Sequence, residues 1–376
     1  MKSQAQDPLL VLENVVREVV RPAAQEVDAR GDFPARSIEA LAEAGLLGAV
    51  AAPEVGGLGG GMRLASRICT RLASDCGSTA MVATMHFSGS AVLERYAPTE
   101  VRKQAASGKH LSTLAFSEAG SRSQFWAPTS TAKKEKGGVR LDARKSWITS
   151  ARHATAYVWS SKPLAASGAS TIWLVPNGTK GLAVQGRYDG LGLRGNDSTA
   201  VVADGVVVPE SAMLGADGAG FEIMMQTVLP IFQVLSASVS VGLMEGAIER
   251  TVAHVSNTRF EHTGEALRDL PTVRAHVARM RIQADAARAL LEDTLAALEA
   301  GRADAMLRVL ECKAAAGDAA LSVTDTGMRV CGGAAFRKEG GLERVFRDAR
   351  AASVMAPTGE ALHEFIGKAV CGLPLF

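Results

Sequence analysis

Glu360 is the carboxylate nearest to a break in the helical pattern late in the chain, in the stretch SVMAPTGEALHEF at 353–365. Ala-Pro-Thr-Gly continues a helix poorly, so we predict that a new helix begins here with Thr358 as its N-cap. A carboxylate within hydrogen-bonding reach of a substrate can act as a general base. An acid in the first turn of a helix is also explained by the helix dipole alone, so Glu360 has two interpretations.

The histidines and cysteines give no metal-ligand pattern. The five cysteines are widely separated and never form a C-x-x-C pair, and the seven histidines form no H-E-x-x-H motif. We therefore predict no metal site and no disulfide framework. An isolated histidine is usually a core or surface residue, and His86, in TMHFSGS, is the one that we retain as a candidate substrate contact.

One glycine motif, GLGLRG at 190–195, has the G-x-G-x-x-G spacing of a dinucleotide-binding turn. A strand is predicted to follow it, so the amides of a helix N-terminus that would bind phosphate are missing. The glycines of APEVGGLGGG at 52–61 lack both the spacing and a preceding strand. We interpret both stretches as turns rather than as phosphate-binding loops.

Three segments with different periodicity must position these residues. Apolar residues follow helical spacing over 1–110, strand-like runs separated by turn residues fill 111–220, and helical spacing returns over 221–376. Within the last segment, Pro271 begins a long run that Gly301 ends. The prediction is an α+β protein with an N-terminal helical domain, a middle antiparallel β domain and a C-terminal helical bundle.

Composition limits the possible partners. The 376 residues are 47% hydrophobic and 21% charged, as in an ordinary globular protein, and the net charge is +2 without a basic block. Charge therefore gives no reason to expect nucleic acid or an anionic membrane as a partner. Glu13 lies inside the first apolar run, which a signal peptide or membrane span would not normally carry. We expect a cytoplasmic protein.

Five stretches resemble, in order, motifs of the acyl-CoA dehydrogenase superfamily of flavoproteins. They are FPARSIEALAEAGLLGAVAAPEVGGLGG, LAFSEAGSRSQ, ARKSWITSA, GLGLRGNDSTAVVADGVVVPESAMLG and GGAAFRKEGGLERVFRDAR. Each is weak alone, but their order across the α, β, α layout gives the resemblance its weight. It implies an acyl-CoA dehydrogenase-like fold that ends in a four-helix bundle.

The resemblance also implies a flavin, FAD or alternatively FMN, and assigns residues to it. In the family, a W-I-T segment lines the flavin, with the threonine hydroxyl near the reactive ring nitrogen; the matching residues are Trp147, Ile148 and Thr149. A flavin needs such hydrogen-bonding groups and an aromatic wall. The segment 114–123 matches a second flavin-contacting stretch, which assigns Leu114, Phe116 and Ser117 to the flavin and Ser123 to the acyl-CoA.

The family's remaining FAD contacts come from a neighbouring subunit, which implies a homo-oligomer, either a dimer or a tetramer. Two of the matching residues depart from the pattern. Arg329 stands where the family usually has glutamine, and Arg259 aligns only with a one-residue gap. The full set that the resemblance assigns is Arg259, Arg329, Gly332, Gly333, Thr358 and Glu360.

The family's catalytic base is missing from its expected place. The Y-E-G-T motif, whose glutamate removes the α-proton of the thioester, falls on 355–358, so Ala356 occupies the position of the base. Some members place the base on the helix after the β domain, which here corresponds to Phe232. Gln233 follows it, where arginine is common, and is a candidate substrate contact. Glu360 is the nearest substitute for the base.

Two enzymatic functions follow from this pattern, and a third option, a non-enzymatic FAD-binding partner subunit, is disfavoured because the flavin-lining residues look intact. The first is FAD-dependent α,β-dehydrogenation of an acyl thioester, on coenzyme A or a carrier protein, with an atypical or relocated base and an electron-transfer protein as redox partner. The second is a flavin-dependent monooxygenase on the same fold, supplied by a flavin reductase, because oxygenation of a heteroatom or an aromatic ring needs no α-proton base. We favour the first because the β-domain segments stay close to the dehydrogenase pattern.

Overall fold

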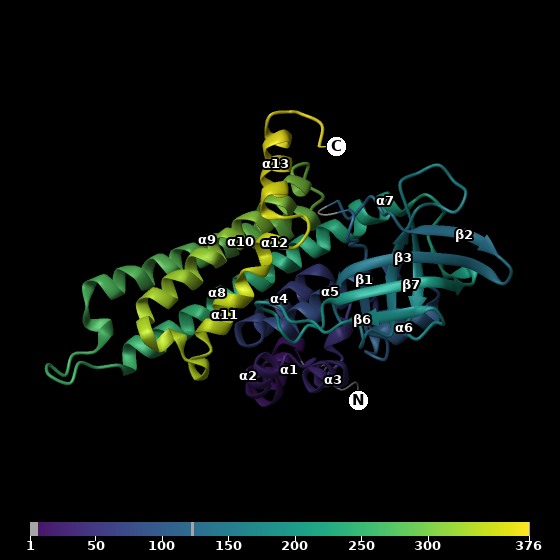
Figure 1. Cartoon of the computed structure of the whole chain (residues 1–376). Coiled ribbons are helices and arrows are strands. Elements are labelled where there is room, and N and C mark those ends of the chain that lie inside the picture. The colour runs from purple at the N-terminus through teal and green to yellow at the C-terminus, as the bar shows by residue number, and fades with distance from the viewer. Residues whose placement is uncertain (1–6, 122–123, 376) are drawn as a thin grey trace, which may run out of the picture.

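The computed structural model describes residues 7–121 and 124–375, which form a helical part, a β part and a second helical part in chain order (Figure 1). The first part begins at Asp7, whose carboxylate caps helix α1 by accepting the Leu9 amide at 2.9 Å. Its helices are α1 (Pro8–Val15), α2 (Arg21–Arg30), α3 (Ala35–Glu43), α4 (Gly61–Asp75), α5 (Gly77–Tyr96) and α6 (Thr99–Ala106).

The middle part contains two four-stranded sheets with the orders β1-β4-β5-β8 and β2-β3-β7-β6. Their inward-facing side chains share one core that includes Trp159 and Trp173, both fully buried. Burial alternates along β3 and β7, as expected for strands with one covered face. The strands are β1 (Ser112–Ala115), β2 (Thr131–Glu135), β3 (Gly138–Ile148), β4 (Ala156–Ser161), β5 (Thr171–Pro176), β6 (Leu182–Gln185), β7 (Thr199–Val208) and β8 (Met213–Leu214).

One strand pair differs from the predicted antiparallel domain. Strands β1 and β4 run parallel, whereas the other pairs described are antiparallel. After β1 the chain forms the β2–β3 hairpin before it returns as β4, and a connection of this length permits parallel pairing. The change from helix to strand falls at Ser112 and the change back at Gly220, close to the predicted borders at 110 and 220; the division into domains itself stays a prediction.

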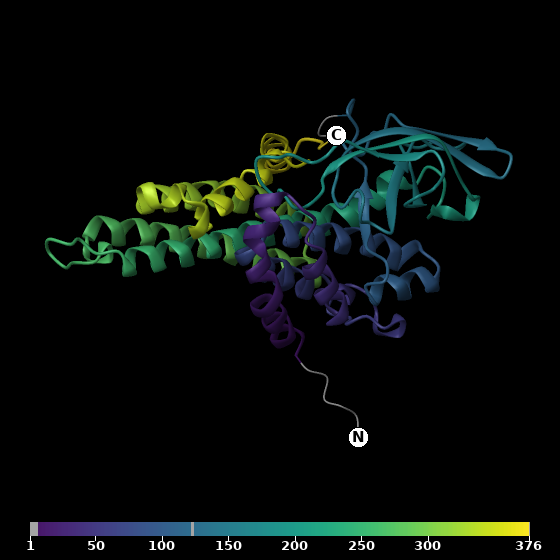
Figure 2. The same cartoon turned by 60° about the horizontal axis from the view of Figure 1, so that its bottom comes forward.

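The C-terminal part is built on long helices that pack side by side (Figures 1 and 2). Helix α8 contacts α9, α10 and α11, which gives the predicted four-helix bundle. Pro271 begins α9 and Gly301 follows its end with φ of 61°. The helices are α7 (Gly220–Ile223), α8 (Leu229–Asn257), α9 (Pro271–Glu299), α10 (Ala305–Cys331), α11 (Leu342–Ala349), α12 (Ala351–Val354) and α13 (Gly359–Val370).

Within the described part of the chain, one helical stretch, Gly220–Asn257, is long and apolar enough to cross a membrane. Its most apolar window is 94% buried inside the protein, so it serves as a core helix. A wide π turn at Met224–Val228 interrupts this stretch just before Pro230. Pro230 has no N–H for the α-helical ladder, which accounts for the irregularity at this point.

The parts meet at an apolar cluster that contains side chains from all three. Met81 and Met85 come from α5, Leu114 and Phe116 from β1 and the residue after it, and Val228 from the π turn. Phe232 of α8 and Met355, just after α12, pack against the same cluster. This junction is where a cavity opens.

Candidate functional site at the junction of the helical parts and the β domain

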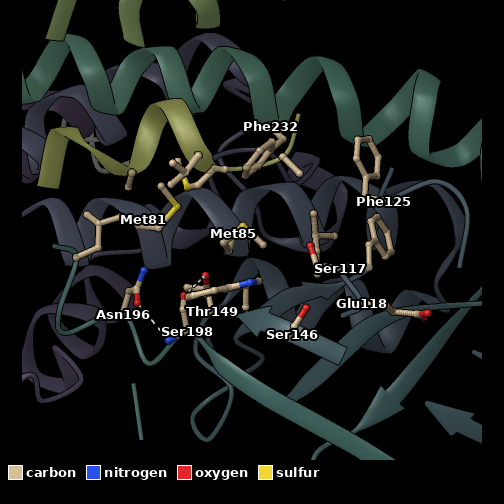
Figure 3. Close-up of a pocket in the computed structure, with 18 of the residues that line it drawn as sticks. Met81, Met85, Ser117, Glu118, Phe125, Ser146, Thr149, Asn196, Ser198 and Phe232 are labelled. Atoms are coloured by element: carbon tan, nitrogen blue, oxygen red, sulfur yellow. Dashed lines mark hydrogen bonds between the residues drawn. The ribbon is translucent and has the colours of Figure 1, made fainter. Parts of the chain in front are cut away.

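A cavity of about 670 Å³ lies at this junction. Figure 3 shows Phe232 of α8 on one side and Thr149, Ser146 and Ser198 of the β domain across the opening. The size falls within the range of small-molecule and cofactor sites, which are mostly apolar with a few placed polar groups. The two sides of this cavity differ in that respect.

The β-domain side carries the polar groups. The Thr149 and Ser198 hydroxyls lie 2.9 Å apart in a hydrogen bond, and the Ser198 amide donates to Asn196 Oδ1 at 3.2 Å. The Ser146 amide donates to the Ser117 carbonyl at 2.9 Å, which ties β3 to the segment after β1. These bonds hold a row of small hydroxyl and amide side chains along the β wall.

Trp147 also lies on the β wall, and its conformation is unusual. Its φ is 59°, in the left-handed region that bulky residues rarely adopt, and 71% of the residue is exposed although it lines the cavity. A register shift in the β3–β7 pairing between Lys145 and Ile148 places Trp147 in a bulge. Such strained positions persist only where the surrounding structure holds them in place, and they concentrate at ligand sites.

Three more non-glycine residues with positive φ lie in the segments next to Trp147. They are Ser150 (57°), Leu193 (51°) and Asp197 (48°). Leu193 lines the cavity, and the amides of Ser150 and Ala151 donate to the carbonyls of Asn196 and Asp197 at 2.8 and 3.2 Å. Backbone strain is thus concentrated where the end of β3 meets the loop that precedes β7.

The glycines of the GLGLRG motif serve close packing of that loop. A Cβ at Gly192 would lie 2.4 Å from the carbonyl oxygen of Arg347 in α11, so a side chain would push the loop away. Asp348, the next residue, accepts the Leu193 amide at 2.6 Å. The motif therefore fastens the cavity loop to α11, in agreement with its interpretation as a turn.

Glu118 is the one carboxylate among the described residues that line the cavity, and it is already paired. Its carboxylate accepts the Lys145 ammonium and the Ser130 hydroxyl, each at 2.6 Å, and the amide and hydroxyl of Thr129. Burial raises the pKa of Glu118, but Lys145 and these hydrogen bonds outweigh it and hold the pKa below its ordinary value. Glu118 is therefore an ionised structural group without a free lone pair for an incoming proton.

The helical side of the cavity is apolar. Met81 and Met85 project from α5 and Phe232 from α8, as Figure 3 shows. The segment around the end of α12 completes this side with Val354, Met355 and Ala356. Ala356 contributes only a methyl group, and none of the described residues on this side of the cavity is an acid or a base.

The structure brings many of the sequence-predicted residues to the cavity. Ile148 is buried next to it, and Ser123 lies outside the described residues. The predicted residues that line the cavity are Leu114, Phe116, Ser117, Trp147 and Thr149, together with Ala356 at the expected base position.

Glu360 and Thr358 do not line the cavity. Thr358 caps α13 by accepting the Ala361 amide at 3.4 Å, and Glu360 is an exposed residue in the first turn of that helix. This is the helix-start arrangement that the helix dipole favours. In the single chain, Glu360 is not placed to reach a substrate in the cavity.

His86 is fully buried in α5 and does not line the cavity either. Its Nδ1 accepts the Ser112 amide and its Nε2 donates to the Leu47 carbonyl, each at 3.1 Å. Burial lowers the pKa of His86 to about 4, which keeps the ring neutral. His86 thus joins α5 to β1 and to the turn at Leu47, and does not face a substrate.

Gln233 is fully buried, and neither atom of its amide group has a hydrogen-bond partner among the described residues. It lies 18 residues before Thr251, which is five full helical turns, so both residues are on the same face of α8. Thr251 lies against Gly327 of α10. Gln233 therefore faces the α8–α10 seam behind the cavity rather than the cavity itself.

The residues assigned to a neighbouring subunit's cofactor lie at the surface, away from the cavity lining. Arg259 is exposed in the loop after α8 and donates to the Gly264 carbonyl at 3.0 Å. Arg329 is exposed in the last turn of α10, and Gly332 and Gly333 follow it. Among the described residues, no group of three or more His, Cys, Asp or Glu side chains could hold a metal ion.

Sequence reasoning missed several lining residues. Asn196 and Ser198 follow the glycine motif, and their polar types after a turn were an available signal. Met81 and Met85 carry no such signal, because a methionine at an apolar position is ordinarily interpreted as a residue of the hydrophobic core. Tyr188 lies four residues before Gly192, and its hydroxyl donates to the Gly192 carbonyl at 3.0 Å.

Comparison with known proteins adds three family matches that together span most of the chain. The acyl-CoA dehydrogenase N-terminal, middle and C-terminal domain models match residues 10–108, 113–206 and 218–371. Cyclohex-1-ene-1-carbonyl-CoA dehydrogenase of Geobacter metallireducens is 28% identical, over 98% of this chain and 99% of its own length. The mitochondrial short-chain specific acyl-CoA dehydrogenase of Bos taurus is 28% identical, over 90% of this chain and 83% of its own.

Among solved structures, butyryl-CoA dehydrogenase from Megasphaera elsdenii superposes with a TM-score of 0.91. The match covers 99% of this chain and 100% of that chain at 22% identity, and at this identity it supports the fold alone.

Proposed function

This chain belongs to the acyl-CoA dehydrogenase superfamily of flavoprotein oxidoreductases, whose cofactor is FAD, and on that premise we propose that it oxidises an acyl thioester. The carrier of the acyl group is coenzyme A or a carrier protein. The observation that supports this proposal best is the asymmetric cavity, with a polar, strained β wall facing an apolar helical wall.

The β wall fits an isoalloxazine ring. Trp147 presents an exposed indole beside the hydroxyls of Thr149 and Ser198, and an exposed aromatic ring gains free energy by stacking on a flat aromatic partner. Ser117 and Ser146 extend the row of small polar groups. Bound FAD supplies a hydride acceptor at this wall.

The helical wall fits the acyl group. Met81, Met85 and Phe232 offer apolar surface that excludes water from the reacting carbons, and methionine side chains adapt to irregular shapes. Because the described lining contains no unpaired charge, the part of the substrate that enters this space is uncharged.

The atypical feature is the absent base. Residue 356 lines the cavity as the family's base position requires, but alanine cannot accept a proton, and Glu118 is saturated with hydrogen bonds. Water is then the acceptor that remains for the α-proton. We propose that α-proton removal is slow and limits the oxidation, unless the substrate has an unusually acidic α-proton.

The monooxygenase remains a second candidate, because a cavity whose described lining offers no free base favours a reaction that does not remove an α-proton. In that case the reductant is NAD(P)H acting through a flavin reductase, molecular oxygen supplies the inserted oxygen atom, and the other oxygen atom leaves as water. The substrate then carries a heteroatom or an electron-rich ring.

Anaerobic mixing of the FAD-loaded protein with a panel of acyl-CoAs separates the two functions. Bleaching of the flavin absorbance by an acyl-CoA supports thioester oxidation. Absence of bleaching throughout the panel, with reduction by a flavin reductase system and fast reoxidation in air, supports the monooxygenase. A purified protein that is colourless and fails to bind added FAD or FMN would contradict both.

We further propose a cytoplasmic homo-oligomer, a dimer or a tetramer, in which Arg259, Arg329, Gly332 and Gly333 approach the cofactor of a neighbouring subunit. The exposed position of these residues in the single chain supports this arrangement. An electron-transfer protein is the proposed acceptor for the dehydrogenase. Light scattering of the FAD-loaded protein measures the number of subunits, and a monomer that retains FAD tightly would contradict the shared site.

A further inference from the structure

Lys313 of α10 is a buried lysine directly behind the apolar cavity wall, and the proposed reaction has not used it so far. Only 2% of the residue is exposed. Among the described residues, no carboxylate lies within ion-pair distance of its ammonium group. A buried charge without a counter-ion is unfavourable, so a hydrophobic residue would be the simpler choice if this position served packing alone.

The contacts of Lys313 are with the turn that carries Ala356. Its Nζ donates to the Met355 carbonyl at 2.9 Å and to the Pro357 carbonyl at 2.7 Å. These two acceptors lie on either side of Ala356 along the chain. Given standard backbone dimensions, the ammonium group therefore lies within about 6 Å of the Ala356 Cα.

A third neighbour of the amine is an aromatic ring of the cavity wall. Nζ is 5.6 Å from the centre of the Phe232 ring, within cation–π distance. Phe232, Met355 and Ala356 all line the cavity, whereas Lys313 does not. One turn further along α10, a Cβ at Gly317 would lie 3.5 Å from that of Ala352 in α12, so this face of α10 carries the segment before the turn as well.

We propose that Lys313 is a positioning residue for the oxidation: it fastens the Met355–Pro357 turn as the cavity wall and fixes where residue 356 stands relative to the substrate. The Nζ group has N–H donors in both its charged and its neutral form, and its hydrogen bonds are stronger in the charged form, so two of them can hold a short turn without helical support of its own. The kinetic part of this inference rests on the proposed function, whereas the structural part does not.

Hydrogen exchange of the backbone amides tests the structural part without any substrate. In Lys313→Met, exchange over 353–361 is expected to rise at least tenfold, while 131–148 in the β domain stays as in the wild type. Lys313→Arg, which keeps charged donors, restores protection. Lys368→Met, a change of a half-buried lysine on α13 that pairs with Glu364, leaves exchange unchanged. Wild-type protection over 353–361 in Lys313→Met would overturn the proposal.

Kinetics then test the link to the reaction. This experiment uses an acyl-CoA that bleaches the flavin absorbance of the wild type. Lys313→Met is expected to bind FAD normally, but the acyl-CoA should reduce its flavin at least tenfold more slowly. Lys313→Arg should recover part of the rate. An unchanged rate overturns the positioning role. If no acyl-CoA bleaches the wild type, the proposed function fails, and the exchange result still decides the proposal on Lys313. Should Lys313→Met not fold, Lys313→Gln, which keeps one donor group, takes its place in both experiments.

A third readout separates positioning from packing. In an Ala356→Glu background, an ammonium group within about 6 Å of the Cα of residue 356 lowers the pKa of the introduced carboxyl. Adding Lys313→Met should therefore move the pH midpoint of flavin reduction upward by about one unit. A midpoint that does not move contradicts the assigned closeness of Lys313 to position 356.

Discussion

The two walls of the cavity differ in the polar groups that they carry. The β wall holds Trp147, Thr149 and Ser198 in a strained and extensively hydrogen-bonded arrangement. The turn after α12 stands in the expected place but carries Ala356. A chain can therefore keep the geometry of a family's site and change the chemistry of one wall, so each wall must be tested by itself.

The largest effect is expected from restoring an acid to the helical wall. Ala356→Glu should accelerate flavin reduction by an acyl-CoA about 10²–10⁴-fold, the usual range for a positioned general base. Rapid mixing under anaerobic conditions measures this rate. Ala356→Gln, which adds similar bulk without a proton acceptor, is the matched control and should stay near the wild-type rate. Equal rates in the two variants would show that position 356 does not face the α-carbon.

Breaking the ion pair beneath the β wall should have a large effect on stability. Lys145→Met leaves the buried Glu118 carboxylate without its ammonium partner, so the free energy of unfolding should fall by about 3–5 kcal/mol. Chemical denaturation of the FAD-loaded protein measures the loss. Lys134→Met removes an exposed lysine whose partner Glu210 is also exposed, and should change stability by less than about 1 kcal/mol.

The pH dependence of stability tests the buried lysine behind the helical wall. Burial lowers the pKa of Lys313 to about 7, below its ordinary value of 10.5. Between these values the unfolded chain binds more protons than the folded one, so this residue makes stability rise with pH. From pH 7 to pH 8.5 the wild type should gain about 2 kcal/mol relative to Lys313→Met. If the free energy of unfolding differs between the wild type and Lys313→Met by the same amount at both pH values, the assigned burial of the charge is contradicted.

A smaller effect is expected at the aromatic face of the β wall. Trp147→Ala should weaken FAD binding about tenfold, because stacked aromatic pairs contribute about 0.5–1.5 kcal/mol beyond burial of area. Trp147→Phe should retain most of the affinity. Fluorescence titration of the apoprotein with FAD measures both, and equal affinities in Trp147→Ala and the wild type would remove the indole from the flavin site.

The smallest effect is expected at Glu360. Glu360→Gln should change the rate of flavin reduction by less than about twofold and stability by a few tenths of a kcal/mol, as for an exposed acid at a helix N-terminus. A tenfold loss of rate, with FAD still bound, would restore Glu360 as the relocated base.

The sequence supported the order of the parts and the β wall better than the surroundings of the base. Helical and strand periodicity predicted the α, β, α layout, and Trp147 and Thr149 were assigned together because both belong to the short W-I-T motif at the end of β3. The parallel pairing of β1 with β4 is a long-range choice that periodicity does not encode.

The surroundings of the base were harder to predict because they come from distant segments. Phe232, Lys313 and Met355 meet only through the packing of α8, α10 and the turn after α12. His86 was a wrong candidate for a different reason. The sequence does not show whether the ring nitrogens of a histidine are already hydrogen-bonded to the backbone, as those of His86 are. A candidate base is therefore best judged after the fold has shown which groups are already paired.

Exchange of the substrate's α-hydrogen tests the central claim most directly, because it reports on proton removal at the helical wall. The FAD-loaded protein is incubated anaerobically with an acyl-CoA in D₂O, and deuterium at the α-carbon is followed by mass spectrometry. We expect no exchange above the buffer rate in the wild type and fast exchange in Ala356→Glu. Exchange in the wild type as fast as in that variant would show that the cavity holds a base other than residue 356 and contradict the proposal.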